Sequence, residues 1–153
     1  MTVLLNVLLV LFSFAIMELV AWSSHKYLMH SMLWFMHRDH HQRDDNSFFE
    51  RNDLFFIVFA TPGILLIYLG FVAGPASPLL WIGSGISLYG MAYVFVHDIA
   101  VHQRIRLFRK LDNRYLRAIR KAHKVHHKYQ HKEDAENFGF LWVPAKYLKE
   151  ARG

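Results

Sequence analysis

Residues 54–96 contain no Asp, Glu, Lys or Arg side chain, and this uncharged run leaves few possible folds. Residues 1–24 carry a single charged side chain, Glu18. About 20 consecutive apolar residues in a helix suffice to cross the hydrocarbon core of a bilayer. A chain of 153 residues with 20% charged residues is too short and too apolar to enclose such helices in polar layers. We therefore predict an all-α, integral membrane helical bundle.

Three membrane spans are expected, at about residues 3–22, 54–72 and 78–97. The second span, as a helix, would be about 28 Å long, close to the hydrocarbon thickness. The sequence Gly-Pro-Ala-Ser-Pro at residues 74–78 is typical of a tight turn, so the second and third spans should form a helical hairpin. The whole chain, 1–153, is expected to form a single membrane domain.

Small residues and one proline are expected to shape the packing of these spans. Pro62 should kink the second span, because proline removes a helical hydrogen bond. Gly83, Ser87 and Gly90 in the third span permit close approach of neighbouring helices.

The distribution of basic residues predicts the orientation in the membrane. Residues 97–153 carry 14 Lys and Arg against 6 Asp and Glu, a net charge of +8, whereas residues 1–96 carry a net charge of −2. By the positive-inside rule, the loop 25–53 and the tail 98–153 are cytoplasmic, and the N-terminus and the turn face the other side. The first span lacks a basic flank and a cleavage site, so we interpret it as an anchor rather than a signal peptide. Nucleic-acid binding is disfavoured, because the basic half follows membrane spans.

Ten of the 11 histidines form a duplicated pattern of two plus three. Each half of the chain has an H-x4-H pair followed by an H-x2-HH triplet, and all ten lie on the predicted cytoplasmic side. The first half contributes His25, His30, His37, His40 and His41; the second contributes His97, His102, His123, His126 and His127. Only His131 lies outside the pattern.

Helix geometry accounts for part of this spacing. Positions i, i+3 and i+4 lie on one face of an α-helix, so each triplet presents three imidazoles together. Positions i and i+5 lie about 140° apart on an ideal α-helix. The H-x4-H pairs must therefore straddle a seam, serve different metals, or sit where the helix end unwinds.

Ten neutral imidazoles are enough for two metal ions with about five ligands each, which predicts a His-rich dinuclear site on the cytoplasmic helices. Imidazole suits Zn, Cu, Fe and Ni alike. The absence of Cys excludes thiolate zinc sites, protein-bound iron–sulfur clusters and cysteine-ligated haem. There is no HExxH zinc motif, and the glycines of GSGISLYG do not match a dinucleotide fingerprint. Redox chemistry at the metals would therefore need electrons from a separate protein.

The sequences HKYLMH, HRDHH, HDIAVH and HKVHH resemble the histidine boxes of the fatty-acid/sterol hydroxylase superfamily, whose members are membrane di-iron oxygenases. Within this superfamily, the chain resembles the bacterial β-carotene 3-hydroxylases. The similarity covers nearly the whole chain and includes its length, the box spacing, the FERNDL stretch and the KEDAENFGFLWVP tail.

The resemblance implies a reaction that uses O2, two electrons and two protons to place a hydroxyl group on C3 of a carotenoid β-ionone ring, converting β-carotene to β-cryptoxanthin and then zeaxanthin. It implies two non-haem iron ions, with the ten boxed histidines as ligands. It also implies a carotenoid substrate in the lipid phase, a ferredoxin-type electron donor with its reductase, and a bacterial inner-membrane location. Two other classes remain open: another fatty-acid or sterol hydroxylase or desaturase of the superfamily, and a non-enzymatic metal-binding membrane protein.

Three further features have two interpretations each. The aromatic-rich residues 32–36 are a candidate substrate slot or interface packing, and the same ambiguity holds for Phe138, Phe140 and Trp142. Glu18 is a candidate hydrogen-bond partner for a metal-binding histidine, or else it lies near headgroups or bonds a neighbouring helix. The basic residues of the tail are a docking face for an acidic ferredoxin or a site for anionic lipid: Arg104, Arg106, Arg109, Lys110, Arg114, Arg117, Arg120 and Lys121.

Overall fold

The computed structural model describes residues 2–42, 47–105, 110–131 and 133–151, and all secondary structure in these ranges is helical. Three long helices hold most of the apolar residues: α1 (Val3–Ser24), α3 (Asp53–Ala73) and α4 (Pro78–Tyr93). Two π-helical segments continue α1 and α4, namely η1 (His25–Met32) and η2 (Val94–Val101). Three shorter helices complete the described chain: α2 (Trp34–His41), α5 (Arg114–His126) and α6 (Ala145–Glu150).

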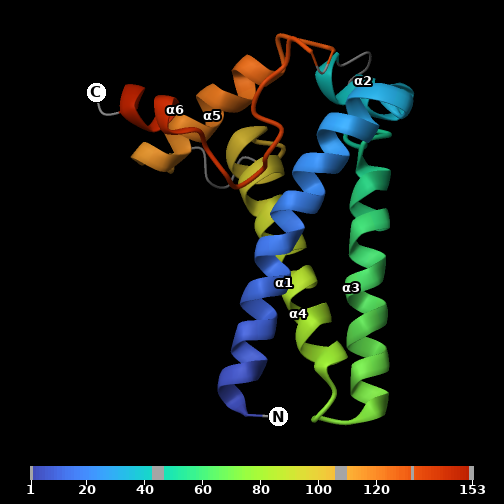
Figure 1. Cartoon of the computed structure of the whole chain (residues 1–153). Coiled ribbons are helices and arrows are strands. Elements are labelled where there is room, and N and C mark those ends of the chain that lie inside the picture. Colours follow the sequence, from blue (N-terminus) through green and yellow to red (C-terminus); the bar gives the residue numbers. More distant parts are fainter. Residues whose placement is uncertain (1, 43–46, 106–109, 132, 152–153) are drawn as a thin grey trace.

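The long helices lie side by side and are long and apolar enough to cross a membrane (Figure 1). With η1 included, the first helix runs over Val3–Met32, and with η2 included, the third runs over Pro78–Val101; the second is α3 itself, Asp53–Ala73. The N-terminus and the α3–α4 turn lie at one end of the bundle, and α2, α5 and α6 lie at the other. The predicted all-α bundle with three membrane-compatible helices is confirmed. The first and third helices run further than predicted because helical hydrogen bonding continues into the histidine motifs.

Small residues bring α4 against both neighbouring helices. A Cβ atom on Gly83 would lie 2.7 Å from the carbonyl oxygen of Gly63 on α3, and Ser87 packs on the same glycine. A Cβ atom on Gly85 would collide with the backbone of α1. Close packing at Gly83 and Ser87 is thus confirmed. Gly90 differs, because its nearest neighbour would be a ring carbon at 3.9 Å, and it borders a cavity.

The connection between α3 and α4 is the tight turn that the sequence predicted. Gly74 has a φ of 93°, a conformation that favours glycine, and the N–H of Ser77 donates to its carbonyl oxygen at 3.0 Å. Pro78 occupies the first turn of α4, where a missing N–H costs little. Helix α3 runs through Pro62 without ending.

The two π-helical segments coincide with the two H-x4-H motifs. The N–H of Leu33 donates to the carbonyl of Leu28, and that of His102 to the carbonyl of His97, both at 2.9 Å and both spanning five residues. This i+5 bonding is that of a π-helix and places residues i and i+5 one turn apart on the same side. In η1 the helix is kinked at His30 and Ser31, whose φ/ψ angles are not helical. The rings of His97 and His102 accordingly lie 4.6 Å apart. Of the three options left open by the sequence, a reshaped helix end is the observed one.

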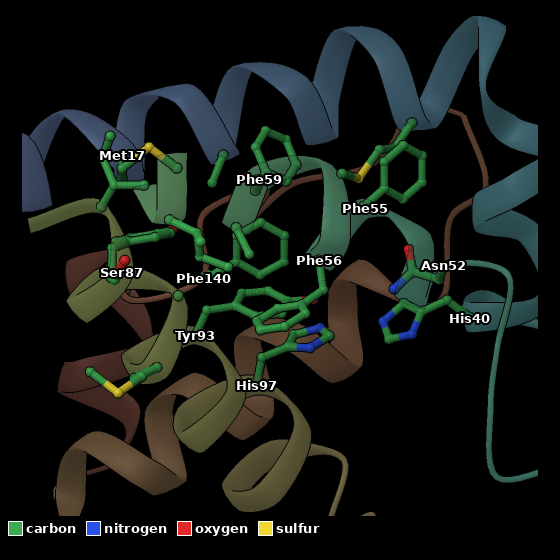
Figure 2. Close-up of a pocket in the computed structure, with 18 of the residues that line it drawn as sticks. Met17, His40, Asn52, Phe55, Phe56, Phe59, Ser87, Tyr93, His97 and Phe140 are labelled. Atoms are coloured by element: carbon green, nitrogen blue, oxygen red, sulfur yellow. The ribbon is translucent and has the colours of Figure 1, made fainter. Parts of the chain in front are cut away.

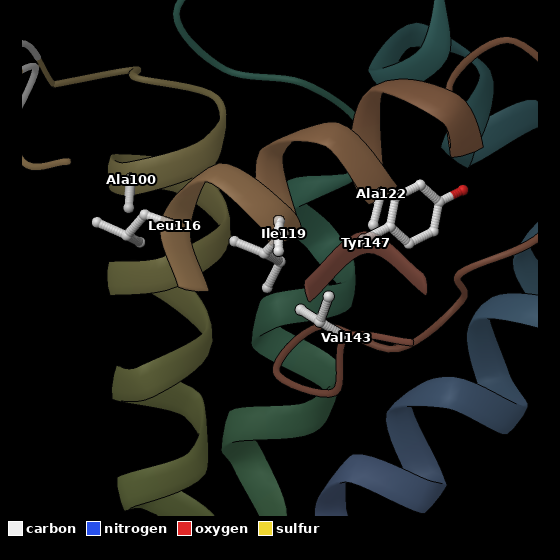
Figure 3. Packing of buried hydrophobic residues seen from close by; sticks show 7 residues of the cluster. Ala100, Leu116, Ile119, Ala122, Val143 and Tyr147 are labelled. Carbon is white, nitrogen blue, oxygen red and sulfur yellow. The ribbon is translucent and has the colours of Figure 1, made fainter. Parts of the chain in front are cut away.

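Helix α5 lies at the histidine end and carries the second triplet. Its strongly amphipathic sequence buries an apolar face against η2 and the C-terminal region (Figure 3). The cluster consists of Ala100, Leu116, Ala118, Ile119, Ala122, Val143 and Tyr147. This packing fixes the position of α5, and with it the position of its histidines.

The glycine contacts predict different outcomes for two matched substitutions. Gly83→Ala should destabilise the protein by about 1–3 kcal/mol, because the new methyl group must separate α3 and α4. Gly90→Ala should be neutral or stabilising, because its methyl group meets ordinary contacts only. Thermal denaturation in detergent measures both variants. Equal midpoints would contradict the assigned packing.

Candidate metal centre

The ten patterned histidines converge at one end of the bundle. Seven of them are buried: His25, His30, His37, His40, His97, His123 and His126. His41, His102 and His127 are partly buried. His131 is exposed, in agreement with its exclusion from the pattern. Residues up to 102 positions apart in sequence thus share one polar interior.

The imidazoles form two groups. In the first group, one ring nitrogen from each member lies within 4.8 Å of the others; its members are His25, His30, His37, His41 and His126. The second group meets the same criterion with His40, His97, His102 and His123. His127 adjoins the second group, with its Nε2 atom 2.8 Å from Nε2 of His123.

Each H-x2-HH triplet divides between the two groups. The outer histidines of the first triplet, His37 and His41, join the first group, while His40 joins the second. The second triplet mirrors this, because His126 joins the group of the first half. On an α-helix, consecutive residues such as His40 and His41 lie about 100° apart, so their rings can face two different sites. The two halves of the chain are thereby interlocked.

Backbone carbonyls fix the ring orientation of three histidines in the first group. Nδ1 of His25 lies 2.9 Å from the carbonyl oxygen of Phe138, and Nδ1 of His126 lies 2.9 Å from that of Glu136. Nδ1 of His30 lies 2.9 Å from the carbonyl of Gln130. A carbonyl oxygen only accepts, so each Nδ1 carries the proton, and each Nε2 of the neutral ring is a bare lone pair.

These lone pairs point at one another. Nε2 of His126 lies 3.1 Å from Nε2 of His25 and 3.1 Å from Nε2 of His30. With no hydrogen between them, such pairs repel, and a cation among them would turn the repulsion into coordination. In the second group, the buried Nε2 atoms of His40 and His97 have no hydrogen-bond partner among the described residues. The donor set therefore fits a metal site.

The second group is oriented by carboxylates instead. Nδ1 of His40 lies 2.9 Å from Glu50, and Nδ1 of His97 lies 2.7 Å from Asp98. Arg104 pairs with both Glu50 and Asp53 at 2.8 Å. A carboxylate partner fixes the ring and raises the basicity of the ligating nitrogen. In the first group, His37 has a neutral partner, the amide oxygen of Asn52, at 2.6 Å.

Burial keeps these imidazoles neutral. Desolvation lowers the pKa of His37 and of His126 to about 3, and that of His127 to about 4. It also lowers the pKa of His40 and of His123 well below the usual value. At pH 7 their lone pairs are consequently free for a metal.

An apolar cavity of about 240 Å³ lies between α1, α3 and α4 and ends at the histidines (Figure 2). His37, His40 and His97 are among the residues that line it. Its walls are largely apolar and include Met17, Phe55, Phe59, Ile86, Tyr93 and Phe140. The cavity could therefore hold an apolar ligand between the membrane-compatible helices and in contact with the histidines.

The sequence left two interpretations open for the aromatic-rich residues 32–36, a substrate slot and interface packing, and the cavity does not favour the slot. None of these residues, all of which the structure describes, lines the cavity. The ring of Trp34 instead packs on the rings of His30 and His41, at 5.4 and 5.3 Å. Of the tail aromatics, Phe140 lines the cavity, Phe138 packs against histidine rings, and Trp142 is exposed.

The sequence reasoning missed the partners of the histidines. Glu50 and Asn52 lie in the FERNDL stretch, which served only as a sign of resemblance, and Asp98 follows a boxed histidine directly. The sequence feature that could have identified them is their position, because polar side chains directly flank the uncharged residues 54–96. Glu18 makes no hydrogen bond to a histidine among the described residues. Its carboxylate instead accepts hydrogen bonds from the hydroxyl of Tyr89 on α4 and from backbone N–H groups of the C-terminal tail.

Comparison with known proteins agrees with this geometry. The model of the fatty acid hydroxylase family matches residues 10–147. The chain is 44% identical over 140 residues to a beta-carotene hydroxylase of Pantoea ananas, covering 91% of this chain and 78% of that protein. It is 37% identical over 141 residues to a beta-carotene hydroxylase of Paracoccus sp. (strain N81106 / MBIC 01143), covering 91% and 85%. With beta-carotene hydroxylase 2, chloroplastic, of Capsicum annuum it shares 40% identity over 139 residues, covering 90% and 44%. No solved structure matches significantly.

The carboxylate partner of His40 yields a prediction about metal affinity. Glu50→Gln should weaken transition-metal binding about 10–100-fold, because it removes the charged acceptor on Nδ1. Chelator competition on the purified protein measures this change. Asp112→Asn, which alters an exposed ion pair with Arg117, is the matched control and should bind as the unchanged protein does. Equal affinity for both variants would refute the role of Glu50.

Proposed function

The chain belongs to the fatty acid hydroxylase family, and from this premise we propose that it hydroxylates carotenoid β-rings at C3. The observation that carries the proposal is the apolar cavity that ends at His37, His40 and His97. The reaction consumes the C3–H bond, O2, two electrons and two protons, and it yields the C3 alcohol and water. The similarity to beta-carotene hydroxylases from bacteria and plants supports the choice of substrate.

We infer that the two histidine groups hold two iron ions. The ligands of one would be His25, His30, His37, His41 and His126, and those of the other His40, His97, His102, His123 and His127. Bound iron supplies the activation of O2, which no side chain of this protein provides. The protein itself supplies neutral, oriented imidazoles and a cavity that excludes water.

The size of the cavity determines how a carotenoid is held. At about 240 Å³ it lies below the range of about 300–1,000 Å³ typical of drug-sized ligands. It therefore accepts one end ring, while the polyene and the other ring remain in the bilayer. Hydroxylation of both rings then takes two binding events, with release of the mono-hydroxylated carotenoid between them.

Positioning matters more than reactivity in this reaction. C4 of a β-ring is allylic and has a weaker C–H bond than C3. Oxidation at C3 requires the walls to present C3 to the histidine end, and a misplacement of about 1 Å is enough to change the outcome. Phe59, Tyr93 and Phe140 supply rigid aromatic walls for this purpose.

The other function classes fit the structure less well. A metal transporter needs sites along a path across the membrane, whereas all ten histidines lie at one end of the bundle. A fatty-acid hydroxylase or desaturase would use the same metals, so only analysis of the reaction product distinguishes it from a carotenoid hydroxylase. We further place the histidine end at the cytoplasmic face of a bacterial inner membrane, because the loop 25–53 and the tail 98–153 carry all the Lys and Arg residues.

We propose that an acidic ferredoxin-type protein, with its reductase, delivers the electrons to a basic stripe on α5. Arg114, Arg117 and Lys121 are exposed there at helical spacing. Arg104 does not belong to this face, because it is largely buried in its pairs with Glu50 and Asp53. Arg106 and Arg109 lie outside the described residues.

Product analysis tests the substrate and the position of attack. Expression in a β-carotene-producing bacterium should yield β-cryptoxanthin and zeaxanthin, because the cavity takes one ring at a time. Chromatography of the extracted pigments measures the yield. Unchanged β-carotene, or hydroxylation at C4, would contradict the proposal.

The ligand assignment predicts the effects of single histidine substitutions. The protein should contain about two iron ions per chain, and His40→Ala or His126→Ala should abolish hydroxylation, because each removes a ligand that crosses between the halves. His131→Ala is the control and should leave activity near normal. Metal analysis and pigment assays measure both properties. Near-normal turnover in both His40→Ala and His126→Ala would overturn the di-iron assignment.

Electron delivery should depend on charge. The rate with a reduced acidic ferredoxin should fall as salt rises, and Lys121→Glu should raise the KM for the donor without changing iron content. Steady-state kinetics in defined proteoliposomes measure both. If the stripe binds only anionic lipid, Lys121→Glu will change vesicle association and leave the donor KM unchanged. Full turnover with NADH and no protein carrier would also contradict this model.

A further inference from the structure

Glu18, near the middle of the first membrane-compatible helix, is bonded by a distant part of the chain. Its carboxylate accepts the backbone N–H groups of Phe140 and Leu141 at 3.0 Å and that of Trp142 at 2.8 Å. The hydroxyl of Tyr89 donates to it at 2.7 Å. A carboxylate that collects several donors forms strong, charge-assisted hydrogen bonds. Glu18 therefore anchors the tail to α1.

The anchored segment also touches the histidines. Residues 136–142, here called the C-terminal strap, have no regular secondary structure and follow α5 in the chain (Figure 1). The strap carbonyls of Glu136 and Phe138 accept the Nδ1–H groups of His126 and His25. The ring of Phe140 stacks on His25 with 4.9 Å between centroids and 11° between planes. Backbone N–H groups of the strap thus bind Glu18, while its carbonyl groups fix the orientation of two imidazoles.

Gly139 allows the strap to approach the carboxylate. A Cβ atom at this position would lie 2.8 Å from Oε1 of Glu18, closer than real contacts permit. A larger residue would force either the Glu18 carboxylate or the strap to move, and either shift would disturb the hydrogen bonds between them. The strap and Glu18 are consequently fitted to each other.

The hydrogen bonds that the strap makes to imidazoles, among the described residues, reach only the first histidine group, and its ring contact with the second group is the edge of the Phe140 ring against His97, with 5.2 Å between centroids. His25 and His126 both belong to the first group. In the second group, the Nδ1 atoms of His40 and His97 are held by Glu50 and Asp98, which lie outside the strap. A displaced strap would therefore disturb the first metal site much more than the second, whose Nδ1 hydrogen bonds do not involve the strap.

We propose that Glu18 is a positioning residue for the first metal site. It acts through the strap, whose carbonyls direct the Nε2 lone pairs of His25 and His126 toward a shared metal. This inference rests on the proposed function, because it assumes a metal in each group. It places the decisive hydrogen bonds of Glu18 on backbone N–H groups rather than on a histidine.

The test compares iron binding in purified full-length variants. Glu18→Leu removes every acceptor while keeping an apolar helix, and Gly139→Ala keeps the carboxylate but disturbs its contact with the strap. Both should raise the dissociation constant of one iron about 10–100-fold and change that of the second much less. Chelator competition should therefore become biphasic, and iron content should approach half. Glu18→Gln, which retains an acceptor oxygen for the N–H groups, should stay close to the unchanged protein.

The outcomes separate this inference from the proposed function. If both disruptive variants keep two tightly held irons, or lose both irons in parallel as helicity falls, Glu18 has no selective positioning role. Equal loss in Glu18→Gln and Glu18→Leu would also overturn it. If Glu18→Leu fails to fold, Gly139→Ala decides the question. If the unchanged protein binds no iron, the proposed function itself fails.

Discussion

The convergence of buried Nε2 lone pairs is the interaction around which the rest of this protein is organised. Each Nδ1–H of His25, His30 and His126 is committed to a carbonyl oxygen, so the second nitrogen of each ring faces the others with no proton between them. Such an arrangement is unfavourable unless a cation occupies it. The π-helices, helix α5 and the C-terminal strap all contribute to holding these rings in place.

The crossing of the two triplets makes the two halves of the chain dependent on each other. His40 from the first half completes the second group, and His126 from the second half completes the first. Neither half can form a complete site alone, so metal binding and the assembly of the membrane helices should be coupled. The cavity between α1, α3 and α4 exists only in the assembled bundle, which ties substrate access to the same event.

The sequence predicted the membrane helices and the histidine sets, because uncharged runs and clustered ligands are local patterns. It did not predict the π-helices. The H-x4-H spacing left several explanations open, and i+5 hydrogen bonding is too rare to be expected from a sequence. The partners Glu50, Asn52 and Asp98 and the strap carbonyls depend on contacts between distant segments. The sequence also did not predict which aromatic residues line the cavity, because aromatic composition does not reveal which face of a helix meets a cavity.

The most direct measurement of the central claim is a crystal structure of the iron-loaded protein with anomalous scattering recorded at the iron edge. Two separate iron peaks are expected, one among His25, His30, His37, His41 and His126, and the other among the second group. His40 and His126 should each coordinate the iron of the opposite half. A single peak, or irons held only by histidines of their own half, would contradict this account.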